Sequence, residues 1–201
     1  MTTLEKKSVF GLEDIVCVGM FAAISFLGVQ FFRIPMPAVV GSPFLHFGNI
    51  FLVLSALLLG GLRGGLASAI GFVIFDLLNG YVPSIPSVAA GCVLGGLTIG
   101  LIFKGMKRAG APWPAAMIVS TLIGYLVKIV VSVAFDVVTM LIAGNPVGVA
   151  VIGAVTSNYA TYINAVISIA VACALYYPFY LIVRRMRIYR QVEGKVFGGR
   201  G

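Results

Sequence analysis

The feature that most constrains this chain is a succession of long apolar stretches with little polar sequence between them. A bilayer core of about 30 Å requires roughly 20 helical residues to cross it. Hydrophobic residues make up 60% of the 201 residues and charged residues only 10%, against roughly 25% charged in soluble domains. A soluble fold of this size could not bury so much apolar surface, so we predict an all-α integral membrane protein. The single membrane domain, residues 1–201, is predicted to have six transmembrane helices at about residues 14–32, 47–61, 64–80, 87–103, 114–143 and 158–183.

The positive charges predict how these spans are oriented. The formal net charge is +8, and 12 of the 14 lysines and arginines fall at the termini or in the second and fourth connections. The predicted outer loops contain only Arg33, so the positive-inside rule places both termini in the cytoplasm. The basic residues lie mostly in the connections between the apolar spans and at the termini, rather than on one continuous surface. We therefore expect the chain to lie in the lipid bilayer and to have no nucleic-acid partner. The cytoplasmic set is Lys6, Lys7, Arg63, Lys104, Lys107, Arg108, Arg184, Arg185, Arg187, Arg190, Lys195 and Arg200.

Three connections carry glycine and proline. Residues 33–45 contain three prolines and are predicted to form an ordered, non-helical outer cap. A second outer loop is predicted to open at Gly144 and to run to about Ser157. The segment from Gly60 to Gly65 is either a tight turn between two helices or a bend within one longer helix, and we favour the turn because Arg63 in mid-membrane would be costly.

Polar residues collect in the outer half of this predicted topology, and we interpret them as candidate substrate-binding residues. Asparagines and tyrosines near helix ends also serve as interfacial anchors or interhelical hydrogen bonds, so each has that alternative reading. The candidates are His46, Asn49, Asp76, Asn79, Tyr81, Tyr125, Lys128, Asp136, Asn158, Tyr162 and Asn164.

Three of these candidates are charged, and charges inside a membrane are usually functional or paired. Lys128 and Asp136 lie on the same predicted helix, eight residues apart. That spacing separates them by about 12 Å along the helix axis and about 80° around it, so they cannot pair directly. Lys128 and Asp136 must each find a partner on another helix, in a water-filled cavity or on a ligand.

Small residues four apart indicate close helix packing. In the first predicted helix Gly19 and Ala23, beside Ala22, form either a packing face or a docking face for another membrane protein. In the fourth, Gly91 with Gly95 and Gly96 with Gly100 are predicted to pack within the bundle.

No enzymatic chemistry is assembled in the sequence. The three cysteines, Cys17, Cys92 and Cys173, lie in apolar stretches without metal-ligand spacing. The chain lacks a phosphate-binding loop, an H-E-x-x-H motif and a G-x-S-x-G elbow. We therefore expect no enzyme activity, no cofactor and no metal site.

Three short motifs resemble one transporter family. They are His46-Phe47-Gly48-Asn49, Leu58-Leu59-Gly60 and Asp76-Leu77-Leu78-Asn79-Gly80-Tyr81. This segment is similar to the substrate-binding S components of energy-coupling factor (ECF) vitamin transporters, in the branch that takes riboflavin, hydroxymethylpyrimidine or pyridoxine-type compounds. Asn49 stands where that branch usually has aspartate, and the lysine often found early in its fourth helix is absent. Lys128 is a candidate substitute for that lysine.

The resemblance implies six helices and a vitamin or vitamin precursor bound near the outer face, beneath the loop between helices one and two. It also implies a separate T component and two ATPase subunits in the plasma membrane of a prokaryote. The small-residue face of helix one, here Gly19, Ala22 and Ala23, would dock that partner. The alternative is a self-sufficient transporter in which Asp76, Asp136 and Lys128 couple uptake to protons. A structural subunit of a membrane assembly is the third reading.

Overall fold

The computed structural model of the chain describes residues 11–36 and 44–185. Within these residues, five apolar helical stretches are long enough to cross a membrane, and a shorter apolar helix accompanies them. The expectation of a helical membrane protein is therefore confirmed, with the addition of one small β-hairpin. In chain order the elements are α1 (Leu12–Gln30), β1 (Arg33–Pro35), β2 (Phe44–His46), α2 (Gly48–Leu58), α3 (Gly61–Asn79), the 3-10 turn η1 (Val82–Ser84), α4 (Ile85–Arg108), α5 (Trp113–Ile142), α6 (Val147–Ser157) and α7 (Tyr159–Val183).

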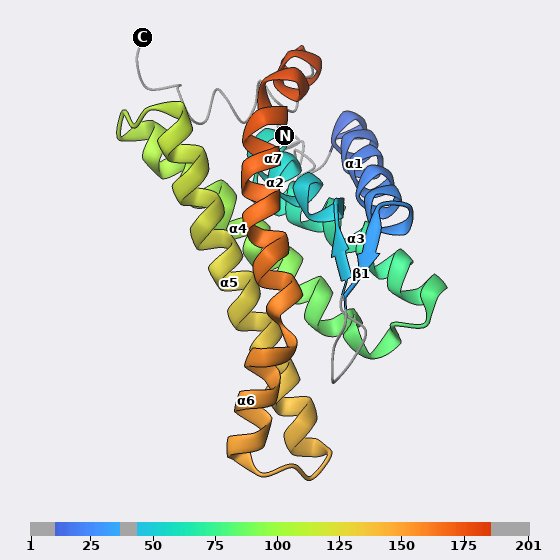
Figure 1. Cartoon of the computed structure of the whole chain (residues 1–201). Helices are drawn as coiled ribbons and strands as arrows, with labels where there is room; N and C mark the ends of the chain where they lie inside the picture. The colour runs from blue at the N-terminus through green and yellow to red at the C-terminus, as the bar shows by residue number, and fades with distance from the viewer. Residues whose placement is uncertain (1–10, 37–43, 186–201) are drawn as a thin grey trace, which may run out of the picture.

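The helices run back and forth between two ends of the molecule (Figure 1). The start of α1, the end of α4 and the end of α7 lie at one end, which is the upper end in the view. The turn between α5 and α6 lies at the opposite end. Basic residues end α4 and follow α7 directly, so this arrangement agrees with the charge pattern of the sequence.

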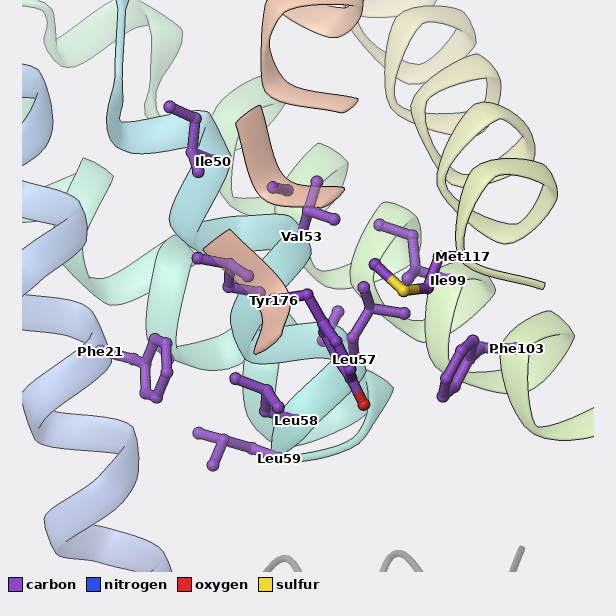
Figure 2. Packing of buried hydrophobic residues seen from close by; sticks show 14 of the residues in the cluster. Phe21, Ile50, Val53, Leu57, Leu58, Leu59, Ile99, Phe103, Met117 and Tyr176 are labelled. Atoms are coloured by element: carbon purple, nitrogen blue, oxygen red, sulfur yellow. The ribbon is translucent and has the colours of Figure 1, made fainter. Parts of the chain in front are cut away.

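Helix α2 forms the centre of the core, although it has only 11 residues, or about 16 Å of helix. Leu54, Leu57 and Leu58 are almost completely buried. Figure 2 shows α2 side chains surrounded by Phe21 of α1, Ile99 and Phe103 of α4, Met117 of α5 and Tyr176 of α7. Because neighbouring helices cover it on every side, α2 does not need the length of a helix that faces lipid.

The predicted outer loop between Gly144 and Ser157 is wrong, because α6 occupies residues 147–157. Gly144 has a φ of 84°, which makes the turn out of α5, and the apolar sequence after Pro146 then continues as helix. Two of the small residues that suggested a loop, Ala150 and Ala154, are completely buried in this helix.

The turn between the second and third helices is also shorter than predicted. Helix α3 begins at Gly61, and the reversal is made at Gly60, whose φ of 89° favours glycine. Gly64 and Gly65 belong to the helix and serve packing, since a Cβ at Gly64 would collide with the backbone nitrogen of Ala56. The turn prediction therefore placed helix-packing glycines in a loop.

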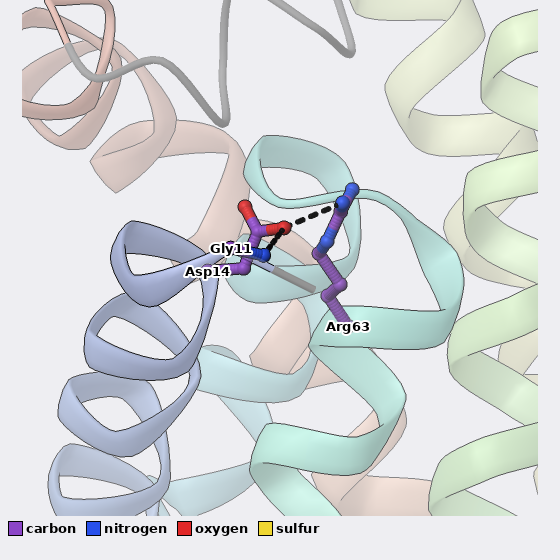
Figure 3. Close-up of polar contacts among 3 residues, drawn as sticks. All are labelled: Gly11, Asp14 and Arg63. Atoms are coloured by element: carbon purple, nitrogen blue, oxygen red, sulfur yellow. Dashed lines mark hydrogen bonds and ion pairs between the residues drawn. The ribbon is translucent and has the colours of Figure 1, made fainter. Parts of the chain in front are cut away.

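Arg63 is consequently in the first turn of α3, where it forms an ion pair with Asp14 of α1 at 2.8 Å (Figure 3). The same Asp14 carboxylate accepts a hydrogen bond from the backbone N–H of Gly11, 3.1 Å away. Two oppositely charged side chains thus hold the starts of α1 and α3 together.

The glycine spacing of α4 was predicted to serve packing, and this is confirmed. A Cβ at Gly96 would lie 2.6 Å from the Cα of Gly65, and one at Gly100 would collide with the backbone nitrogen of Gly61. Helices α3 and α4 therefore meet backbone to backbone.

Candidate functional site

The connection between α1 and α2 contains an antiparallel hairpin in which Arg33 faces His46 and Pro35 faces Phe44. Its β2 strand is fixed to α7 by one side chain, Asn164. The Asn164 Oδ1 accepts a hydrogen bond from the backbone N–H of His46 at 3.0 Å, and its Nδ2 donates to the backbone carbonyl of Phe44 at 3.1 Å. The Asn164 side-chain amide thus supplies to the edge of β2 the acceptor and the donor that the backbone of a third strand would supply.

A chain of hydrogen bonds leads from this hairpin to α5. The Lys128 Nζ donates to Asn49 Oδ1 at 2.5 Å, and Asn49 Nδ2 donates to His46 Nε2 at 3.1 Å. The hydroxyl of Tyr125 donates to the backbone carbonyl of Asn49 at 3.2 Å. Five of the predicted site residues, His46, Asn49, Tyr125, Lys128 and Asn164, therefore form one connected set, which we call the Lys128 group.

The sequence makes room for the lysine through two glycines of α4. A Cβ at Gly91 would lie 3.2 Å from the Cγ of Lys128, and one at Gly95 would lie 3.3 Å from its Cβ. The aliphatic stem of Lys128 therefore lies along the glycine face of α4, and its ammonium group extends to the first turn of α2. This contact is a second role for the Gly91–Gly95 spacing, beside helix packing.

Burial keeps His46 neutral. Desolvation, reinforced by the nearby Lys128 ammonium, lowers the pKa of the His46 imidazole from 6.5 to about 3. A neutral imidazole can accept the hydrogen bond from Asn49 at Nε2, which places its proton on Nδ1. The Lys128 group therefore contains a single cation.

Aromatic rings adjoin the Lys128 group on the hairpin side. The His46 ring lies edge to face with Phe72 at 5.3 Å and 5.5 Å from Phe44. Phe44 is 5.7 Å from both Phe75 and Tyr81, and these two stack at 5.8 Å. We call Phe44, Phe72, Phe75 and Tyr81 the aromatic group.

Two cations lie over these rings. The Arg33 guanidinium is 5.3 Å from the centre of the Phe75 ring, and the Lys128 ammonium is 5.5 Å from that of Phe72. Among these residues the sequence identified only Tyr81 and Lys128 as site candidates. The spacing of Phe72, Phe75 and Asn79 along one face of α3 was the available signal for the rest.

Asp76 and Asn79 lie beside the aromatic group but have partners of their own. The Asp76 carboxylate accepts a hydrogen bond from the Ser84 hydroxyl at 2.9 Å. The Asn79 side chain donates to the side-chain oxygen of Gln30 at 2.9 Å, which connects α3 to the end of α1. These contacts give both residues a structural role at this end of α3.

Asp136 and Asn158 form a separate cluster where α6 meets α7. Asn158 Nδ2 donates to the Asp136 carboxylate at 2.6 Å, and the Ser132 hydroxyl donates to Asn158 Oδ1 at 2.8 Å. Lys128 and Asp136 each have a partner outside α5, as their spacing predicted. Tyr162 is apart from both clusters, since its hydroxyl donates to the Val155 carbonyl at 2.9 Å in an exposed contact.

The three small residues predicted to dock a partner do not share one face. Gly19 and Ala23 are exposed, and a Cβ at Gly19 would meet no atom within 4 Å. Ala22 is buried, and its carbonyl lies where a Cβ at Gly71 of α3 would need to be. Gly19 and Ala23 are therefore available to a partner, whereas Ala22 packs α1 against α3.

Comparison with protein families agrees with this architecture. The family model of the ECF-type riboflavin transporter S component matches residues 9–180, which is more than four fifths of the chain. Comparisons with curated proteins and with solved structures gave no match. A family model that covers this much of the sequence identifies the fold and the transport role together. The chain belongs to the family of S components of ECF-type riboflavin transporters.

Proposed function

We propose that this chain binds a vitamin or vitamin precursor with a flat heteroaromatic ring and takes it up as the substrate-specific S component of an ECF transporter. The observation that carries the proposal is the Lys128 group, in which polar side chains of α2, α5 and α7 converge beneath the hairpin. Sites for small molecules combine apolar and aromatic walls with a few placed polar groups. The Lys128 group and the adjoining aromatic group supply both.

The proposed assembly contains a T component and two ATPase subunits in the plasma membrane of a prokaryote. The short helix α2 is proposed as the sixth crossing, and both termini are proposed to be cytoplasmic. Lys104, Lys107 and Arg108 at the end of α4, with Arg184 and Arg185 after α7, support this orientation. A reporter enzyme that works only in the cytoplasm should therefore be active when it is fused after Arg200, and one that works only outside the cell should be inactive there.

A direct test is to purify the chain in mild detergent and to identify any small molecule that accompanies it by mass spectrometry. Uptake is then measured in cells with and without co-expressed T and ATPase subunits. The proposal expects uptake only with these subunits present. Uptake that needs only a proton gradient would favour the self-sufficient transporter instead.

The geometry of the charges favours the S component over that alternative. Asp76, Asp136 and Lys128 form hydrogen bonds in three different sets, with Ser84, Asn158 and Asn49 respectively. A proton relay requires neighbouring titratable groups, and within residues 11–36 and 44–185 these three form no ion pair with one another.

The docking face has its own test. Gly19→Leu places a large side chain on the exposed face of α1 without an internal clash, so binding should be retained while uptake with the T and ATPase subunits is lost. Gly105→Leu is the matched control, because a Cβ at Gly105 of α4 also meets nothing within 4 Å. Equal loss of uptake in both variants, or loss of binding in Gly19→Leu, would count against docking through α1.

A further inference from the structure

Within residues 11–36 and 44–185, Lys128 is a cation without an anionic partner. Its ammonium group is half-buried and uses one donor on the neutral Asn49 amide. The rings of Phe72 and Tyr125 lie 5.5 Å and 5.9 Å from it. An ammonium has three donors, and removing it from water is costly unless an opposite charge compensates.

The acidic residues do not supply that charge. Asp14 is paired with Arg63, while Asp76 and Asp136 accept hydrogen bonds from Ser84 and Asn158. Glu13 begins α1, and Glu5 and Glu193 lie outside the described residues. Within residues 11–36 and 44–185, the ion pair of Arg63 with Asp14 is the one salt bridge.

The hydrogen-bond chain that contains Lys128 includes no acidic side chain. His46 is the other titratable side chain in the hydrogen-bond chain, and it is held neutral. Arg33 lies over the rings of Phe44 and Phe75, and it too forms no ion pair within the described part of the chain. Two cations therefore flank one aromatic group.

We propose that the substrate is a heteroaromatic compound with an anionic group, a phosphate or a carboxylate, and that Lys128 binds this group while the aromatic group contacts the ring. This inference rests on the proposed function and specifies its substrate class. Asn49 is then a specificity-determining residue, because an aspartate at this position would neutralise Lys128 internally. Arg33 contributes a second attraction for the anion from the hairpin.

The test compares neutral and anionic members of two scaffolds, riboflavin with riboflavin 5′-phosphate and pyridoxine with 4-pyridoxate. Affinities are measured by calorimetry on the purified full-length chain. In the scaffold that binds, we expect the anionic member to bind at least about tenfold more tightly, since a charge-assisted hydrogen bond is lost in the neutral one. Lys128→Gln should remove this preference, and Lys107→Gln, at the other end of the bundle, should leave it unchanged.

Asn49→Asp supplies a second variant with the same side-chain shape. It should reduce the preference for the anion to less than about a third of its original value, because the aspartate would neutralise the Lys128 ammonium. A wild-type chain that binds the neutral member equally well or better would overturn the inference and leave the proposed function standing. An anion preference that persists in both Lys128→Gln and Asn49→Asp would also overturn it. Failure of both scaffolds to bind would refute the proposed function together with the inference.

Discussion

The hydrogen bonds of Asn164 predict how tightly the hairpin closes over the site. Asn164 is only 4% exposed, and its amide makes two bonds to the backbone of β2 and none to its side chains. Asn164→Ala removes both bonds and leaves the His46 N–H without a partner. At roughly 0.5–1.5 kcal/mol for each bond, docking of the hairpin should weaken by about 1–3 kcal/mol.

Ligand affinity should fall in proportion to the fraction of molecules in which the hairpin is docked. A loss of about 1–3 kcal/mol corresponds to roughly 5- to 150-fold in the dissociation constant if binding requires the docked hairpin. Asn164→Asp keeps an acceptor for the His46 N–H but loses the donor to the Phe44 carbonyl. Its effect on the position of β2 should therefore be intermediate.

The assay combines calorimetry with hydrogen exchange of the peptide that contains His46. In Asn164→Ala the His46 amide should exchange faster, and in Asn164→Asp its protection should be largely retained. Asn145→Ala is the matched control, because the Asn145 side chain donates to the Met140 carbonyl at the end of α5, away from the hairpin. Unchanged exchange at His46 and unchanged affinity in Asn164→Ala would refute the reasoning.

Three further predictions concern other parts of the molecule. Arg63→Gln leaves the buried Asp14 carboxylate unpaired, so thermal unfolding in detergent should show a loss of about 3–5 kcal/mol, and addition of Asp14→Asn to the same chain should recover part of it. Because the folded-state pKa of His46 is lowered to about 3 from 6.5, the unfolded chain binds more protons between these values. The contribution of His46 to the free energy of unfolding is thus complete above pH 6.5, and it falls by about 1.4 kcal/mol per pH unit as the pH drops towards 3. In a pH series of melting temperatures, His46→Gln should flatten that slope. Tyr162→Phe removes only an exposed bond to the Val155 carbonyl, so calorimetry should find an unchanged ligand affinity, and a loss of tenfold or more would place Tyr162 in the site.

The sequence predicted the helical membrane class and excluded a direct pair between Lys128 and Asp136, because both conclusions follow from strong, local physical rules. Apolar length specifies a helix in a bilayer, and eight residues between Lys128 and Asp136 exclude direct pairing whatever the tertiary structure. The segment from residue 147 to residue 157 was mispredicted because glycine and alanine fit both a loop and a close helix contact. The burial of Ala150 and Ala154 in the folded chain distinguishes the two.

The grouping of the site residues could not be predicted for a related reason. Most of the eleven polar candidates lay in the predicted outer half, with Lys128 near mid-depth, and depth does not specify which helices are neighbours. The hydrogen bonds separate Asn164, which bonds the hairpin, from Asn158, which lies six residues earlier in the chain and bonds Asp136. Phe44, Phe72 and Phe75 of the aromatic group were missed because the sequence interpretation treated phenylalanines as hydrophobic residues only and did not use the spacing of Phe72 and Phe75 along α3.

The short, enclosed helix α2 has a consequence for the biosynthesis of the chain. Eleven residues are too few for the insertion machinery to recognise as an independent span, since about 20 are needed to cross the bilayer. Helices α1 and α3 can partition into lipid by themselves, whereas α2 gains its favourable surroundings only from protein neighbours. Helix α2 therefore has to insert after α3 or together with it. The ribosome must complete α3 before α2 can be stably placed in the membrane. A chain released before that point would retain one membrane-anchored helix and an unprotected apolar segment, which makes it a natural substrate for quality-control proteases.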